Sequence, residues 1–295
     1  MAAKDDEKIT VAAVARRIGV APATLRTWAR RYGLGPSGHE AGEHRKYLPQ
    51  DLAKLIMMRR LIVAGVSPAE AAGQALSHKG SLNLEQIVET VHERSDVVDA
   101  IVSAAQSLDH NFVEALLRQE ISQFGVIDSW HEVMVPVLII VGDIWAQTGE
   151  GIEVEHLLSE SITNVLRDFS REIKSPINPR PVLLASVGEE LHTLPLHALT
   201  AALAELNIEC QVMGARTPLA ALSSVVTRSA PPAVFLWAQL AKNGDPIFFK
   251  NIPNVRPAPR VVLGGPGWDR DQCREVPFAE DLALACSEIK QAIGA

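Results

Sequence analysis

Apolar side chains recur at two different spacings along this chain, and the change of spacing divides it. From residue 11 to about residue 174 they recur every three or four residues, as in amphipathic helices. From residue 182 onward, short apolar runs alternate with helical segments, which is typical of a parallel sheet covered by helices. The pattern therefore predicts a multidomain protein of the α and α/β classes.

The first two predicted helices span residues 11–17 and 23–32. Gly19 can adopt the left-handed conformation that ends the first helix, and Pro22 suits the start of the second. Two short helices joined by a tight turn that contains glycine form a helix-turn-helix. A Gly-, Pro- and Ser-rich stretch over residues 33–43 and the basic stretch 44–48 then predict a two-stranded wing. Further helices are predicted at residues 49–64 and from Pro68 onward.

The second of these helices is rich in arginine and aromatic residues. Leu25 and Trp28 are expected to face inward, which leaves Thr24, Arg26 and Arg30 for the major groove and nearby phosphates. The wing is expected to present its basic side chains to the DNA backbone. The whole predicted DNA-binding set is Thr24, Arg26, Thr27, Trp28, Arg30, Arg31, Arg45, Lys46 and Tyr47.

This N-terminal segment resembles the winged helix-turn-helix of the MerR family of transcription regulators. The matching stretches are ITVAAVARRIGVAPATLRTWARRYGL, HRKY and MRRLIVAGVSPAEA, which together cover about a quarter of the chain. Metal-sensing members continue with one long dimerisation helix and a short cysteine loop, and this sequence has neither. The resemblance implies double-stranded operator DNA as a partner, a homodimer or higher homo-oligomer, and other transcription proteins as candidate partners.

Four helices are predicted next, at residues 95–107, 110–124, 127–147 and 152–174, and they are expected to form a four-helix bundle. A proline-rich linker follows at residues 174–181. Strands are then predicted at residues 182–187, 208–213, 233–238 and 261–263, alternating with helices. These make a Rossmann-like, flavodoxin-like domain with its ligand crevice at the carboxyl ends of the strands. The expected domains are residues 1–80, 81–174 and 175–295.

Charge is unevenly distributed between these domains. The whole chain of 295 residues carries a formal net charge of −7, yet residues 9–60 hold roughly ten Lys or Arg against three acids. A basic helical head on an acidic body is the pattern of a nucleic-acid-binding module. The acidic N-terminus, three scattered cysteines and short apolar runs predict a cytoplasmic protein without a membrane partner.

The helical and α/β segments together resemble the cobalamin-binding module shared by methionine synthase-type proteins and by light- or cobalamin-responsive MerR-type repressors. The resemblance rests on Trp145, Glu155 and His156 in the helices and on Glu190 and His192 after the first strand. It implies that His192 ligates the cobalt of a cobalamin such as adenosylcobalamin, while Glu190 orients its imidazole. The full implied cofactor set is Trp145, Glu155, His156, Glu190, His192, Trp237, Gly264 and Gly265.

Three positions depart from that pattern. Pro195 stands where the family has the glycine of its histidine loop. Trp237 stands near a Ser or Thr that lines the tunnel for the nucleotide tail, and it is large enough to fill that tunnel. Ala146 replaces a histidine of the light-responsive members, so a light-driven cobalt adduct is not expected. A ligand-responsive regulator and a regulator whose pocket no longer binds cobalamin both stay open.

An enzyme is the alternative from another class, namely a corrinoid-carrying methyltransferase or mutase subunit. The winged head argues against it, because such carriers need no DNA-binding module. The sequence also lacks a nucleophile–base motif, a P-loop and a metal cluster of catalytic spacing. We therefore expect a regulator and not an enzyme.

Overall fold

The structure is a computed structural model that describes residues 9–37, 46–77, 84–91 and 94–294. The chain forms two compact units. The first comprises Met1–Gln119 and Glu132–Ser161, and the second comprises Glu120–His131 and Ile162–Ala295. The predicted division into three domains at residues 80 and 174 stays a prediction, and each unit is described by itself.

The first unit begins with the predicted helix-turn-helix. Helix α1 spans Val11–Arg17, and Thr10 caps it by accepting a hydrogen bond from the Ala13 amide at 3.3 Å. Helix α2 spans Pro22–Tyr32 and ends at Gly33, whose φ of 73° is left-handed. Helices α3 (Pro49–Val63) and α4 (Pro68–Ser77) pack against each other and complete the head.

The turn between α1 and α2 requires a glycine for two reasons. Gly19 has a φ of +65°, which L side chains rarely adopt, and a Cβ placed on it would lie 2.9 Å from Cβ of Ser107. Ser107 follows α6 (Arg94–Gln106), so the turn of the head packs closely against the end of a helix of the middle segment. The head and this part of the middle segment are therefore held together within one unit.

Short α5 (Leu84–Val88), which was not predicted, precedes α6, and the other predicted helices of the middle segment are present with changed ends. These are α7 (His110–Ser129), α8 (Val135–Thr148) and α9 (Ile152–Ser170). The last helix ends at Ser170 and not at residue 174. Because the four long helices are divided between the two units, their packing as a four-helix bundle stays a prediction.

A break in α7 falls where the sequence predicted the gap between two helices. Gly125 has a non-helical φ of 80° and ψ of 170°, and the π-helical turn Trp130–Met134 follows. The Val126 amide, which follows the break, donates to Glu205 Oε1 at 3.0 Å within the second unit. Burial raises the pKa of Glu205, and this hydrogen bond partly offsets the effect.

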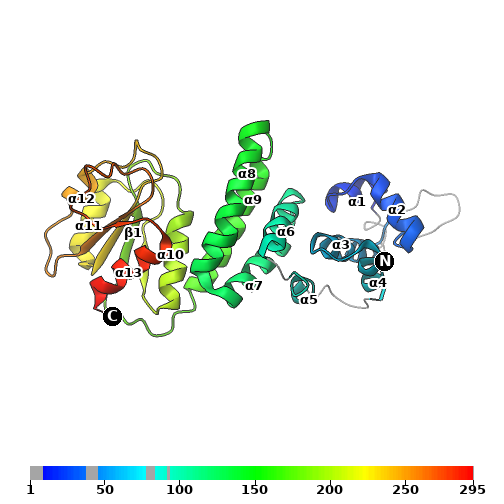
Figure 1. Ribbon diagram of the computed structural model, residues 1–295, viewed down its shortest axis with the longest axis horizontal. Coiled ribbons are helices and arrows are strands. Elements are labelled where there is room, and N and C mark those ends of the chain that lie inside the picture. Colours follow the sequence, from blue (N-terminus) through cyan, green and yellow to red (C-terminus); the bar gives the residue numbers. More distant parts are fainter. Residues whose placement is uncertain (1–8, 38–45, 78–83, 92–93, 295) are drawn as a thin grey trace, which may run out of the picture. The chain divides into compact units, whose positions relative to one another are not determined.

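The second unit, drawn in Figure 1, holds a parallel β-sheet. The sheet has five strands in the order β2-β1-β3-β4-β5. The strands are β1 (Val182–Ser186), β2 (Cys210–Val212), β3 (Ala233–Trp237), β4 (Arg260–Gly264) and β5 (Phe278–Ala279). This is the flavodoxin-like order of a doubly wound sheet, so the predicted fold class is confirmed. The fifth strand was not predicted, because two residues are too few to produce an alternating pattern.

Helices cover both faces of this sheet. Helices α10 (Leu194–Glu205) and α13 (Leu282–Ile293) pack against each other on one face. Helices α11 (Leu219–Ser229) and α12 (Ile247–Lys250) contribute buried side chains to the core on the other, in contact with apolar residues of β1, β3 and β4. The four-residue α12 was not predicted either.

The proline-rich linker is attached to the sheet. The Asn178 side chain is 4% exposed; its Nδ2 donates to the carbonyl oxygens of Arg180 and Glu209, and its Oδ1 accepts from the Glu209 amide. The segment between α9 and β1 is therefore fixed to the start of β2. By length and composition alone, His110–Thr148 is apolar enough to cross a membrane, but Gly125 and the π-helical turn interrupt it. The expectation of no membrane partner stays a prediction.

Candidate functional site

The loop between β1 and α10 carries the predicted metal-ligating histidine. It leaves the sheet after Ser186, turns at Gly188 with a φ of +63°, and enters α10 at Leu194. Pro195 lies in the first turn of α10, where the missing N–H has no helical partner and the fixed φ favours the helix. The replacement of the family's glycine by proline is thus compatible with this loop.

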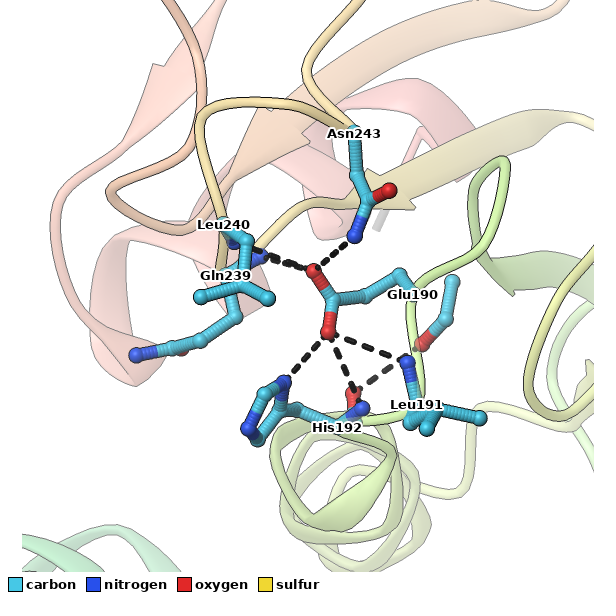
Figure 2. Close-up of polar contacts among 7 residues, drawn as sticks. Glu190, Leu191, His192, Gln239, Leu240 and Asn243 are labelled. Carbon is cyan, nitrogen blue, oxygen red and sulfur yellow. Dashed lines mark hydrogen bonds and ion pairs between the residues drawn. The ribbon is translucent and has the colours of Figure 1, made fainter.

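Glu190 is the centre of the loop and is completely buried. Its Oε1 accepts hydrogen bonds from the Leu191 amide at 3.0 Å, from the His192 amide at 3.1 Å and from His192 Nδ1 (Figure 2). Its Oε2 accepts from three donors in the segment after β3, which are the amides of Gln239 and Leu240 at 2.9 and 3.0 Å and Asn243 Nδ2 at 2.9 Å. Six hydrogen bonds therefore hold one carboxylate between two loops.

These hydrogen bonds determine the charge of Glu190. Burial alone would raise the pKa of the carboxyl group, because a charged group loses its hydration. Hydrogen bonds from Asn243, His192 and Leu240 favour the ionised form and lower the pKa of Glu190 to about 2. Glu190 is thus a carboxylate at neutral pH and can accept a hydrogen bond from Nδ1 of His192.

The His192 ring is held on one side and open on the other. Its side chain is 53% exposed although its Nδ1 contacts Glu190, and Ser186 Oγ donates to its backbone carbonyl at 3.1 Å. Among the residues that the structure describes, none pairs with Nε2. Figure 2 shows this edge of the ring turned away from Glu190. An imidazole with Nδ1–H donated to a carboxylate and Nε2 free is the arrangement found at metal-ligating histidines.

Asn243 and the amides of Gln239 and Leu240 were missed by sequence analysis. They lie some fifty residues beyond Glu190, and two of the three contribute only backbone N–H groups, which no residue type reveals. The order of the strands in the sheet could have revealed these donors. Because β3 is the neighbour of β1, the segments that follow these two strands meet at the same edge of the sheet.

Trp237 lies at the end of β3, in register with Ser186 on β1 and Gly264 on β4. A Cβ placed on Gly265 would lie 3.2 Å from Trp237 Cδ2, so the indole packs against that glycine. Trp237 Nε1 is buried and has no hydrogen-bond partner among the described residues. An unpaired buried donor costs about 1–3 kcal/mol, so this end of the sheet lacks one acceptor.

The helical part of the predicted cofactor set lies in the first unit. Trp145 near the end of α8 is 48% exposed, which excludes it from the core. On α9, His156 Nε2 lies 3.7 Å from Glu155 Oε2, and both side chains are exposed. Glu190, His192, Trp237, Gly264 and Gly265 belong to the second unit. A shared site for the two groups stays a prediction.

The residues of the predicted DNA-binding set differ in how exposed their side chains are. Arg26, Arg30 and Arg31 are exposed on α2, whereas Thr24 and Thr27 are half-buried. Trp28 and Tyr47 are 7% and 2% exposed, so these two aromatic rings pack within the head, and their contact with DNA stays a prediction. Lys46 and Arg45 are the remaining residues of the predicted DNA-binding set, and both belong to the predicted wing. Arg45 lies outside the described residues.

One backbone pairing next to the predicted wing falls within the described residues. Tyr47 pairs antiparallel with Ile9, and the two residues exchange hydrogen bonds of 2.9 and 3.0 Å. The partner of Tyr47 therefore comes from before α1, whereas residues 38–45 of the predicted wing lie outside the described residues. Asp51, which was not predicted to act, is 6% exposed and accepts hydrogen bonds from Leu48 and Ser37, and so fixes the end of the loop at α3.

Two known families match this chain in succession. The family described as MerR HTH family regulatory protein matches residues 9–75, and the family described as B12 binding domain matches residues 97–167. The match to a MerR-type helix-turn-helix is thus followed along the chain by the match to a B12-binding domain. The B12-binding match covers the helices from α6 to α9, directly before the α/β domain that carries His192.

Two relatives align with this chain over most of their length. Both come from Myxococcus xanthus. The HTH-type transcriptional repressor CarH is 27% identical over 263 residues, which cover 85% of this chain and 84% of CarH. The HTH-type transcriptional repressor CarA is 27% identical over 267 residues, which cover 88% of this chain and 87% of CarA. The chain is thus homologous to HTH-type transcriptional repressors, which supports a regulator over an enzyme.

Among solved structures, the monomethylamine corrinoid protein of Methanosarcina barkeri is similar in fold to about two thirds of this chain. It aligns with a TM-score of 0.50 at 12% sequence identity, over 68% of this chain and 99% of its own length. At this identity the similarity concerns the fold alone. It agrees with a helical segment followed by a Rossmann-like domain.

Proposed function

We propose that this protein is a cytoplasmic MerR-type transcription regulator whose DNA affinity or oligomeric state is set by a corrinoid bound at the His192 loop. Operator DNA is its partner through α2 and the wing, and it acts as a homodimer or higher homo-oligomer. Support comes from the homology to transcriptional repressors and from the match to a B12-binding domain.

The observation that carries this proposal is the Glu190–His192 pair. The carboxylate holds Nδ1 and the rigid loop leaves Nε2 accessible, so the donor set fits a metal that takes one neutral imidazole. Cobalamin, when bound, supplies a cobalt centre with a position for such a ligand. In this proposal Trp145, Glu155 and His156 cover the opposite side of the cofactor, and Gly264, Gly265 and Trp237 adjoin its periphery.

Regulation in this proposal follows from linkage. A ligand changes DNA binding only if it has different affinities for two states of the protein. A corrinoid that favours one oligomer would change how many heads reach the operator, and operator DNA would change the corrinoid affinity by the same factor. The coupling can therefore be measured as the effect of corrinoid on DNA affinity or as the effect of operator DNA on corrinoid affinity.

The test is an absorbance spectrum of the purified protein after incubation with adenosylcobalamin or hydroxocobalamin in the dark, followed by desalting. We expect retained corrinoid colour, and we expect His192→Ala to abolish it or shift the bands. Glu189→Ala, which changes an exposed neighbour of the same loop, should leave the spectrum unchanged. A colourless wild-type protein would reject the corrinoid part of the proposal. Gel-shift titration of the native promoter region, with and without corrinoid, tests the regulatory part.

One observation favours a second candidate, in which the pocket no longer accepts cobalamin. The Trp237 indole lies against Gly265, where it can occupy space that a bound ligand would need. The protein would then regulate through protein partners or another small molecule. Under this candidate Trp237→Ser creates cobalamin retention that the wild type lacks, whereas retention by the wild type rejects it.

A further inference from the structure

A pocket in the first unit lies at the turn between α6 and α7, where the DNA-binding head meets the middle segment. Its volume is about 260 Å³, and its charged and polar lining includes Arg17, Arg59, Arg60, Asp109, His110 and Asn111. Drug-sized ligands usually occupy about 300–1,000 Å³, so this pocket suits a smaller molecule and is separate from the His192 loop in the other unit.

The one carboxylate in this lining is already engaged. Arg60 Nε and Nη2 donate to the two oxygens of Asp109 at 2.8 and 2.7 Å, and the Arg60 guanidinium also lies 5.6 Å from the centre of the Phe112 ring. Asp109 Oδ1 accepts a further hydrogen bond from the Phe112 amide at 3.3 Å. Asp109 therefore compensates Arg60 and has little capacity left for a second arginine.

Arg59 has no such compensation. It is 8% exposed, and Nη2 donates to the Ser103 carbonyl oxygen at 3.0 Å. Within the described part of the chain this is its one hydrogen bond, although a guanidinium has five N–H donors. Burial lowers the pKa of Arg59, and Arg60 lowers it further while Asp109 opposes both. A buried cation with unused donors thus borders an open pocket.

The other walls add to the positive potential. Arg17 lies at the end of α1 and is exposed, and His110 and Asn111 form the first turn of α7, a helix of 20 residues. The N-terminus of a helix presents N–H groups and partial positive charge, both of which attract anions. Three arginines against one aspartate leave a surplus of two positive charges in the lining.

We propose that this pocket is a binding site for a small phosphate-type oxyanion. Two negative charges would balance the lining, and phosphate monoesters and inorganic phosphate carry about −1.5 to −2 at neutral pH. The forked donors of Arg59 match phosphate oxygens in geometry as well as in charge. An anion bound here would join residues of α1, α3 and α7, and would thereby stiffen the connection of the head to the middle segment.

The experiment uses the full chain without corrinoid, so its outcome is independent of the proposed function. Inorganic phosphate is titrated at pH 7.5 against sodium chloride of matched ionic strength, with calorimetry and thermal unfolding as readouts. We expect saturable binding and a rise in Tm that grows with phosphate concentration, because a ligand that binds only the native state stabilises it.

Three variants make the test specific. Arg59→Gln should weaken phosphate binding at least tenfold. Arg17→Gln, at an exposed position where folding is safe, should weaken it about threefold. Arg228→Gln, on the exposed end of α11, should leave it unchanged. Phosphate that acts no differently from chloride would overturn the proposal, as would equal phosphate affinity in the wild type, Arg59→Gln and Arg17→Gln.

A second arm identifies the source of the phosphate group. If the pocket takes a DNA phosphate, inorganic phosphate will compete with operator duplex beyond the effect of matched chloride, and Arg59→Gln will weaken operator binding. If it takes a free metabolite or phosphate ion, operator affinity in chloride will be the same in the wild type and in Arg59→Gln. Either result is compatible with the site, and each assigns a different source.

Discussion

Two buried charged side chains in this molecule differ in how much of their hydrogen-bonding capacity is used. Glu190 in the second unit accepts six hydrogen bonds and has no remaining capacity. Arg59 in the first unit makes one hydrogen bond to the described residues and borders a pocket. A saturated charge can only position its neighbours, as Glu190 positions His192. An unsaturated charge keeps donors for a ligand, so the number of unused hydrogen bonds distinguishes a supporting residue from a binding residue.

The largest effect is expected for Asp109→Ala. Loss of this carboxylate leaves Arg60 and Arg59 buried side by side without a counter-charge, which should destabilise the first unit by about 4 kcal/mol. Segment-resolved hydrogen exchange over α3 and α7 measures the change. Asp271→Ala, which removes an exposed ion pair with Arg274, should cost less than about 0.5 kcal/mol. A loss below about 1 kcal/mol for Asp109→Ala would show that the pair contributes little.

Glu190→Ala is expected to destabilise the second unit by about 3 kcal/mol, because it leaves six donors near the sheet edge without their acceptor. Hydrogen exchange of the loops after β1 and β3 measures this. The adjacent Glu189→Ala is the matched control, since Glu189 pairs with Arg216 at an exposed position and should matter by less than about 1 kcal/mol. Equal effects of the two substitutions would contradict the contrast between saturated and exposed charge.

Acid should weaken the second unit through the same carboxylate. The folded-state pKa of Glu190 is about 2, below its ordinary 4.5, so the ionised form stabilises the fold above pH 4.5. This contribution, on the order of 3 kcal/mol, is lost progressively as the pH falls from 4.5 towards 2. We expect the stability difference between wild type and Glu190→Gln, measured by urea unfolding, to shrink over that range. A constant difference would contradict the assigned pKa.

Gly19→Ala should destabilise the head by about 2 kcal/mol, because a left-handed φ and the close approach of Ser107 act together. Gly33→Ala is the matched control, since its φ is also left-handed but no atom lies within 4 Å of the added Cβ, so that about 1 kcal/mol is expected. Limited proteolysis of the head measures the loss of stability in each of the two variants. Equal losses would show that the contact between the head and the α6–α7 turn carries no energy.

The smallest effect is expected for Arg59→Met in phosphate-free buffer. Removal of an incompletely compensated buried charge, with the apolar stem retained, should change stability by less than about 1 kcal/mol in either direction. Hydrogen exchange over α3 provides the comparison with Asp109→Ala. A loss as large as that of Asp109→Ala would mean that Arg59 is a structural cation, and would remove the distinction drawn above.

The sequence predicted the helices of the head and the sheet because both have strong periodic signals. Gly19, Pro22 and Pro68 mark helix ends by their backbone restrictions alone. The inward position of Leu25 was equally clear from helical spacing, and it is confirmed at 0% exposure. Trp28 was assigned both to the core and to the DNA surface, and its burial supports the first assignment.

The rest depended on contacts between residues far apart in sequence. The partner of Tyr47 lies before α1, and the acceptor of the Val126 amide lies on α10, so no local pattern could identify either. The Glu190–His192 pair was implied by the resemblance to the cobalamin-binding module, whereas the donors that fix Glu190 follow a different strand. The pocket beside Arg59 was missed for the same reason, because its walls come from three separate helices.

The shared carboxylate of Glu190 also has a dynamic consequence. The loop after β1 and the loop after β3 each give three hydrogen bonds to the same side chain. Neither loop can open without withdrawing donors from a buried anion, so the two should fluctuate as one cooperative element with a common opening free energy. His192 is therefore either presented in its fixed orientation or released together with both loops, with no partly ordered state between.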